Sequence, residues 1–346
     1  MRCTWTPAAK LEAGHLYCFD NVDFVPGVRY IESADDWNEF ALALNSGEGV
    51  GVWVEGDSLV RMTAGFAVKG DLEQVAEFPY ALECNGVTVS RTDATKALFG
   101  KVSGSVRNLN LAGTSGAPAV ADTLSSGRLL NCNTSVEVLL QTDTTVVFGA
   151  LVSEATDGAL VNCTNSAVIK IEQDGSQANL VCTVGGLAGH VTGAGEFVSC
   201  RNTGNITVTG GYVGGITTGT VSGNPDGTAA EFCIKNCSNT GNIMGICDLE
   251  HGVAYTGAIT ARITSSAPIV NCWYSCDVVR DATAIPAQGK ILTGGLYGFK
   301  SNDVTAVVTN CYYNNNKQVA TSSVATGYTS IHFRNGHVAA LLGEPW

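Results

Sequence analysis

Residues 161–200 read VNCTNSAVIKIEQDGSQANLVCTVGGLAGHVTGAGEFVSC, and this stretch contains one complete period of a repeat. An apolar residue followed by Asn-Cys opens the period, Gly-Gly-Leu stands in its middle, and Val-Ser-Cys opens the next one. The cysteine recurs at spacings of 31 to 39 residues, at Cys132, Cys163, Cys200, Cys237, Cys272 and Cys311. The glycine phrase alternates with it, at 148–151, 184–187, 213–216, 256–259 and 293–296. A period of a few tens of residues predicts one supersecondary unit stacked on copies of itself.

The composition indicates that the repeated unit consists of short strands and turns. Charged residues make up 14% of the chain, against roughly 25% in a typical soluble domain, and 41 of the 346 residues are glycine. From residue 50 onward, short β-prone runs are separated by Gly, Asn, Asp and Ser. We therefore predict an all-β fold, a right-handed parallel β-helix (solenoid). One coil of three short strands needs fewer residues than the period, so we expect loops in some coils, most clearly at 222–231.

The two ends of the repeat region differ from its middle. Residues 33–46 predict an amphipathic helix with Ser33 as N-cap and Asn45-Ser46-Gly47 as its end, and such a helix suits a cap over the first coil. Residues 330–342 predict a short C-terminal helix, although Gly336 lies inside it. We divide the chain into an N-terminal segment at 1–28, interpreted as a possible remnant of a preceding domain, and a β-helix domain at 29–346.

The shared repeat position of the six cysteines predicts a stack of buried free thiols, because free cysteine behaves as a small apolar residue. Disulfides between neighbouring coils are the alternative, since strands about 4.8 Å apart lie within the Cα range of a disulfide. No Cys-x2-Cys pair occurs, which argues against zinc.

The charge and the hydropathy of the chain limit the classes of binding partner that we expect. The net charge of −12 argues against nucleic acid and anionic membranes as partners. The sequence contains no run of about 18 apolar residues, so we predict no direct membrane insertion. The first residues contain no apolar signal-peptide core, so we expect an export signal upstream of this sequence.

Several segments resemble a known group of bacterial surface proteins. Residues 184–189 (VGGLAG) and 292–298 (LTGGLYG) resemble the GLUG motif of surface proteins, often from Bacteroidetes. Further parts of that group are similar to residues 30–37, 43–47, 83–89, 98–102, 106–111, 310–313 and 336–342, although Glu83-Cys84 stands where the group usually has Asp-Gly. Residues 11–17 resemble a strand region of fimbrillin-like pilus proteins. The resemblance implies a right-handed β-helix at the cell surface with a role in attachment, and it implies no catalytic residues.

An enzyme is the alternative, because polysaccharide lyases and hydrolases are also built on β-helices. Such enzymes need carboxylates that converge on neighbouring coils. Here the acidic residues between 137 and 196 scatter relative to the repeat. The segment 247–251 (CDLEH) is the densest set of potential metal ligands, but it mixes soft and hard donors and is interpreted as a solvated loop. We therefore predict no enzymatic activity, no catalytic residues, no metal site and no cofactor.

Aromatic residues concentrated in the last two coils are the candidate binding site. They are Trp273, Tyr274, Tyr297, Tyr312 and Tyr313. Rigid aromatic side chains dominate binding hot spots, but these residues could instead pack under the C-terminal helix. Because neighbouring strand residues face opposite ways, at most one of each adjacent pair can be exposed. The expected function is non-catalytic adhesion at the cell surface, with a host glycan, an extracellular matrix protein or a fimbrial subunit as partner; a structural spacer is the further alternative.

Overall fold

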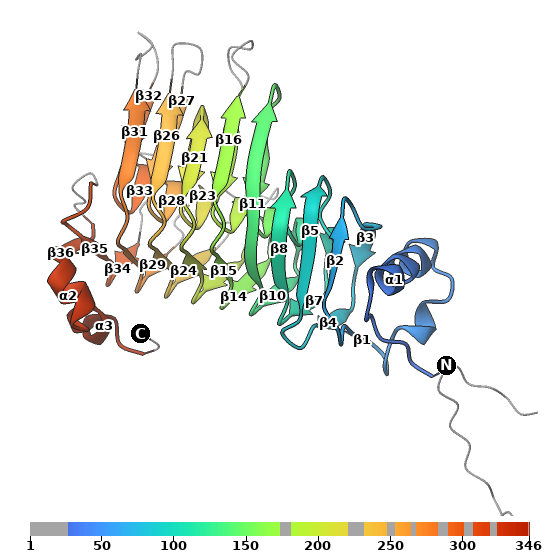
Figure 1. Ribbon diagram of the computed structural model, residues 1–346. Helices are drawn as coiled ribbons and strands as arrows, with labels where there is room; N and C mark the ends of the chain where they lie inside the picture. Colours follow the sequence, from blue (N-terminus) through green and yellow to red (C-terminus); the bar gives the residue numbers. More distant parts are fainter. Residues whose placement is uncertain are drawn as a thin grey trace, which may run out of the picture.

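The computed structural model describes residues 27–173, 181–220, 232–247, 253–263, 268–282, 290–300, 307–318, 324–344 and 346. Within these residues, strands from successive coils lie side by side along one axis, which runs from helix α1 to helices α2 and α3 (Figure 1). Almost all of the predicted N-terminal segment 1–28, the expected loop 222–231 and most of the segment 247–251 lie outside the described residues.

The described strands form four sheets. The nine-stranded sheet contains β1 (Leu59–Arg61), β4 (Ala81–Glu83), β7 (Ser105–Arg107), β10 (Arg128–Leu130), β14 (Ala159–Val161), β19 (Glu196–Val198), β24 (Cys233–Lys235), β29 (Ile269–Val270) and β34 (Val308–Thr309). The eight-stranded sheet contains β3 (Val75–Phe78), β6 (Phe99–Val102), β9 (Ala121–Ser125), β13 (Val152–Thr156), β18 (Ala188–Thr192), β23 (Thr217–Thr220), β28 (Thr260–Ile263) and β33 (Tyr297–Lys300).

The fourteen-stranded sheet contains β2 (Phe66–Lys69), β5 (Thr88–Ala94), β8 (Asn110–Ser115), β11 (Asn133–Thr142), β15 (Thr164–Asn165), β16 (Ile169–Gln173), β20 (Arg201–Asn202), β21 (Ile206–Thr209), β25 (Ser238–Asn239), β26 (Ile243–Cys247), β30 (Trp273–Tyr274), β31 (Val278–Ala282), β35 (Tyr312–Asn314) and β36 (Thr326–Tyr328). The five-stranded sheet contains β12 (Val147–Gly149), β17 (Cys182–Gly185), β22 (Gly211–Gly214), β27 (Val253–Gly257) and β32 (Lys290–Thr293).

The chain visits these sheets in a repeating order, and strands of neighbouring coils pair in parallel. One coil runs through β14, β15, β16, β17 and β18, and β19 then pairs with β14 to begin the next coil. The coils above and below repeat this parallel pairing in the nine-stranded sheet. The predicted all-β architecture with parallel sheets is confirmed, and the arrangement is compatible with a β-helix or solenoid.

The period lengthens along the chain because later coils carry extra strands. Leu82, Val106 and Leu129 are register partners and lie 24 and 23 residues apart, whereas the partners of Leu129 onward are 31 to 39 residues apart. The added residues form the five-stranded sheet together with the long strands that rise from β11 onward (Figure 1). Additional strands therefore account for part of the length that we expected loops to supply.

The Asn-Cys phrase forms a corner of each coil. Asn131, Asn162, Asn236, Asn271 and Asn310 all adopt left-handed backbone, with φ between 51° and 55°. Asparagine tolerates this region better than other residues with a Cβ, because its side chain hydrogen-bonds locally. The corner turns the chain from the nine-stranded sheet into the fourteen-stranded sheet and points the next side chain inward.

That inward side chain is the cysteine, and the prediction of buried free thiols is confirmed. All six cysteines are at most 3% exposed and are free. Each thiol donates to a carbonyl oxygen of the preceding coil, at sulfur–oxygen distances of 3.3 to 3.7 Å. Burial raises the pKa of the Cys163, Cys200 and Cys237 thiols well above their usual range.

The glycine phrase makes the tight turn between the five-stranded and eight-stranded sheets. A Cβ added to Gly185 would overlap the backbone carbonyl of Ala188, and a Cβ on Gly214 would overlap that of Thr217. Glycine is therefore required by close backbone approach.

The predicted N-terminal helix is confirmed as α1 (Ala34–Ser46), followed by the short 3-10 helix η1 (Val50–Val52). The Ser33 hydroxyl accepts the Asp36 backbone N–H at 3.1 Å, and Gly47 ends the helix at φ 74°. Trp37 and Phe40 are buried and meet Phe78 and Phe99 of the eight-stranded sheet edge-on. The helix thus covers apolar side chains of the first coils.

The predicted helix 330–342 was wrong as a single element. The segment forms α2 (Ser330–Arg334) and α3 (His337–Leu342), and Gly336 between them has φ 80°. This left-handed residue interrupts the helix, as glycine readily allows. Val338 and Leu342 are buried, whereas Ile331 is 69% exposed.

We expect Gly185→Ala to destabilise the protein by about 1–3 kcal/mol, because the new methyl group would displace the backbone of the turn and of the next coil. Gly51→Ala is the matched control, since a Cβ at Gly51 meets no atom within 4 Å. Urea unfolding of both variants measures the difference. Equal midpoints for the two variants would contradict this account of the turn.

The buried thiols predict a loss of stability at alkaline pH. Their folded-state pKa is raised, so the folded state holds its protons while the unfolded state loses them above about pH 8.5. The contribution of these thiols to the free energy of unfolding is thus fully present below about pH 8.5. Above that pH it falls, by up to about 1.4 kcal/mol per pH unit for each thiol. Unfolding measured between pH 7 and 10.5 should show this fall, and Cys200→Ala should make it shallower. A pH-independent unfolding midpoint would refute the assignment.

Candidate functional site

The predicted aromatic residues of the last coils separate into inner and outer sets. Strands β30 and β35 pair so that Trp273 lies beside Tyr312 and Tyr274 lies beside Tyr313. Tyr274 and Tyr313 are 0% and 9% exposed and stack with ring centroids 5.6 Å apart. Trp273 and Tyr312 lie on the opposite face of the sheet and are half-buried. One member of each adjacent pair is therefore outside, as strand alternation requires.

Tyr274 and Tyr313 consequently belong to the core and are not available for surface binding, which corrects their place in the predicted site. They continue an internal ladder of Asn165, Asn202 and Asn239. Within it, Asn165 Nδ2 donates to Asn202 Oδ1 and Asn202 Nδ2 donates to Asn239 Oδ1, each at 2.8 Å. Burial raises the pKa of the Tyr274 phenol, and its hydroxyl has no hydrogen-bond partner among the described residues.

Tyr297 lies apart from the other four predicted residues. It begins β33 in the eight-stranded sheet, directly after the glycine turn, and pairs in register with Thr260. It is half-buried and packs against the core. The structure therefore does not bring Tyr297 into one surface with Trp273.

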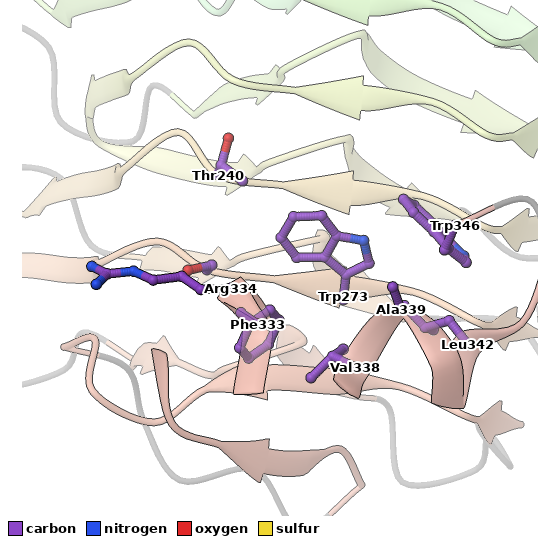
Figure 2. A pocket seen from close by; sticks show the side chains of 9 residues that line it. Thr240, Trp273, Phe333, Arg334, Val338, Ala339, Leu342 and Trp346 are labelled. Carbon is purple, nitrogen blue, oxygen red and sulfur yellow. The ribbon is translucent and has the colours of Figure 1, made fainter. Parts of the chain in front are cut away.

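The outer face of β30 forms one wall of a cavity of about 270 Å³ beneath the C-terminal helices. Figure 2 shows the Trp273 indole facing Phe333 and Val338 from α2 and α3, with Trp346 on its other side. The Trp273 ring lies 5.7 Å from the Phe333 ring and 5.8 Å from the Trp346 ring, between centroids. The remaining lining residues are Thr240, Ser275, Arg334, Ala339 and Leu342. We call this the Trp273 groove.

The lining of the Trp273 groove is mainly apolar, and its polar residues are Thr240, Ser275 and Arg334. Burial raises the pKa of the neighbouring Tyr312, which packs against Tyr328 with ring centroids 5.8 Å apart. The Arg334 side chain extends away from Trp273 (Figure 2). Trp273 thus packs under the C-terminal helices, as the packing alternative expected, and this packing leaves a groove. The binding role of the aromatic cluster stays a prediction.

Phe333 and Trp346 line the groove although the sequence analysis did not single them out. Neither residue belongs to the repeat, so no periodic signal marked them. Among the aromatic residues of the described chain, Tyr212, Tyr255 and Phe299 form another column, stacked with centroids 4.7 to 5.0 Å apart. The Arg262 guanidinium covers the Tyr212 ring at 4.8 Å, so the faces in this column are largely occupied from within.

The described residues contain no group of three or more His, Cys, Asp or Glu side chains placed to hold a metal ion. No helix in the described ranges is both long enough and apolar enough to cross a bilayer.

Comparison with known proteins supports the fold. No protein-family model matches the chain. No curated protein matches it either. Among solved structures, it is similar to the crystal structure of a "putative immunoglobulin A1 protease from Bacteroides ovatus", with a TM-score of 0.50 and 17% identity. The match covers 81% of this chain and 86% of the other. At this identity the likeness shows the fold alone.

We expect Tyr274→Ala to destabilise the protein by about 3–5 kcal/mol, because it empties a large buried site. Tyr274→Phe is the matched control and should be neutral or stabilising, because it removes a buried hydroxyl without a partner. Chemical unfolding measures both. A large loss of stability in Tyr274→Phe would show that the hydroxyl is hydrogen-bonded after all.

Proposed function

We propose that this protein is a non-catalytic bacterial cell-surface module, built on a right-handed parallel β-helix, that attaches to a partner through the Trp273 groove. The carrying observation is the half-buried Trp273 indole, which forms the wall of a cavity with Phe333 and Trp346. Aromatic rings that keep one accessible side offer apolar contact at a small loss of conformational entropy. A module that served only as a spacer would have no use for such a cavity.

A glycan is the partner that this groove fits best. Sugar-binding and other small-ligand sites combine apolar walls with a few polar groups that fix orientation. The Trp273 groove combines an indole wall with the hydroxyl-bearing residues Thr240 and Ser275 at its margin. A matrix protein or a fimbrial subunit remains the alternative partner within the same function.

Ion pairs formed by described carboxylates favour a binding role over enzymatic cleavage of glycosidic bonds. A general acid needs a raised pKa and a second carboxylate nearby. Instead, Lys101 lowers the pKa of Glu77, and Lys170 lowers that of Glu172. Burial does raise the pKa of Asp122, but its neighbour is the Gln74 amide, which donates to it at 3.0 Å.

The surface location rests on the resemblance of the glycine phrases to the GLUG motif, and it belongs to the same proposal as the attachment role.

A glycan array and a matrix-protein binding screen test the function. We expect Trp273→Ala to weaken the attachment found in the screen by about tenfold or more, because aromatic hot spots contribute at least about 2 kcal/mol. Tyr30→Ala is the control, since Tyr30 is 39% exposed and lies at the opposite end of the solenoid. If the Trp273→Ala variant attaches fully and its melting temperature is unchanged, the Trp273 groove is excluded as the attachment site.

A further inference from the structure

The corner asparagines form a hydrogen-bonded ladder on the outside of the solenoid, and one coil interrupts it. The Asn131 Nδ2 group donates to Asn108 Oδ1 at 2.8 Å, and Asn162 Nδ2 donates to Asn131 Oδ1 at 2.8 Å. In the next coil the corner residue is Ser199, which keeps the left-handed backbone at φ 56°. Because serine lacks the terminal amide, the ladder ends at Asn162, whose Oδ1 faces the position of the missing donor.

A cavity of about 300 Å³ lies at this interruption. Its lining consists of Val161, Asn162, Ser199, Arg201, Asn236 and Trp346. We call it the Ser199 cavity. Its volume is at the lower end of the range of small-ligand sites, roughly 300–1,000 Å³. Trp346 also lines the Trp273 groove, so one indole separates the two sites.

Two residues that line the Ser199 cavity each carry a buried polar atom without a hydrogen-bond partner in the described parts of the chain. Asn236 is 8% exposed, and its buried Oδ1 has no hydrogen-bond partner there. The buried indole Nε1 of Trp346 also has none. A buried polar group without a partner costs about 1–3 kcal/mol, so the hydrogen bonding behind the cavity wall is incomplete.

Arg201 supplies a positive charge at the same place. Its guanidinium lies 5.5 Å from the Trp346 ring centroid and forms no ion pair with any residue that the structure describes. The neighbouring Arg128, in contrast, is paired with Glu196 at 3.2 Å. Arg201 is exposed, so its charge is accessible to a ligand at the cavity.

We propose that the Ser199 cavity is a subsite for a sugar residue that carries a carboxylate. The Arg201 guanidinium matches a carboxylate in a bidentate geometry. The Asn162 carbonyl and the Ser199 hydroxyl suit sugar hydroxyls, and the Trp346 indole forms an apolar part of the cavity lining. This inference rests on the proposed attachment function and names the class of glycan: an acidic oligosaccharide that extends past Trp346 into the Trp273 groove.

The sharpest test is Ser199→Asn, because it restores the ladder and fills the cavity. Asparagine suits φ 56° better than serine and can donate to Asn162 Oδ1, so the variant should be at least as stable as the wild type. Binding of an oligogalacturonate or of sialyllactose, measured by calorimetry, should weaken about tenfold or more. Ser199→Ala leaves the cavity open and should weaken binding less than about tenfold.

A second pair of variants tests the charge. Arg201→Gln should weaken binding of both acidic sugars about tenfold to a hundredfold, whereas Arg128→Gln removes a nearby arginine outside the cavity and should change it little. Lactose and cellotetraose serve as neutral probes, and a peptide with a free terminal carboxylate serves as the non-sugar probe.

The outcomes separate this inference from the function on which it rests. Binding of the acidic sugars that Ser199→Asn and Arg201→Gln both weaken supports the subsite. Equal binding of neutral sugars, binding of the peptide instead, or binding untouched by Ser199→Asn overturns it. If Trp273→Ala weakens attachment but no acidic sugar is bound, the subsite alone is overturned. If Trp273→Ala leaves attachment unchanged, the proposed function itself is overturned.

Discussion

The left-handed corner at the Asn-Cys phrase is the constraint on which the rest of the structure depends. A coil can lie in register on its neighbour only if each coil turns at the same place and by the same backbone geometry. Asparagine adopts this geometry at five corners, at φ between 51° and 55°. Because the following cysteine then points inward, its thiol bonds to the coil before it, and corner and core are set by one dipeptide.

The same corner explains how the protein departs from regularity without losing its register. The five-stranded sheet is inserted between fixed points, so the chain lengthens from β11 onward while the nine-stranded sheet continues unbroken. At Ser199 the backbone keeps the corner and only the side chain changes. A change of one side chain thus opens a cavity on the surface while the neighbouring coils remain in place.

The parts of the fold that could be predicted from the sequence are those that the repeat imposes at every coil or that a local sequence signature marks. The inward cysteines, the glycine turns and the N-capped helix α1 each follow from a local requirement that recurs or has a known signature. The site was predictable only in part. Trp273 stands in a repeat strand, but Phe333 and Trp346 reach it from outside the repeat, by tertiary packing that no spacing reveals. Tyr274 and Tyr313 could not be assigned to a face from the sequence, since alternation shows that neighbours differ but not which one is outside.

Parallel stacking also determines how the molecule responds to force. Hydrogen bonds between coils run along the stacking axis, so a pull along that axis acts on the coil-to-coil interfaces in series, and they give way one at a time. Release of a single coil, such as the 37 residues from Cys163 to Cys200, would free about 120 Å of extended chain, where stacking had occupied only about 5 Å. A stack of this construction lengthens in discrete steps under load and keeps the remaining coils folded.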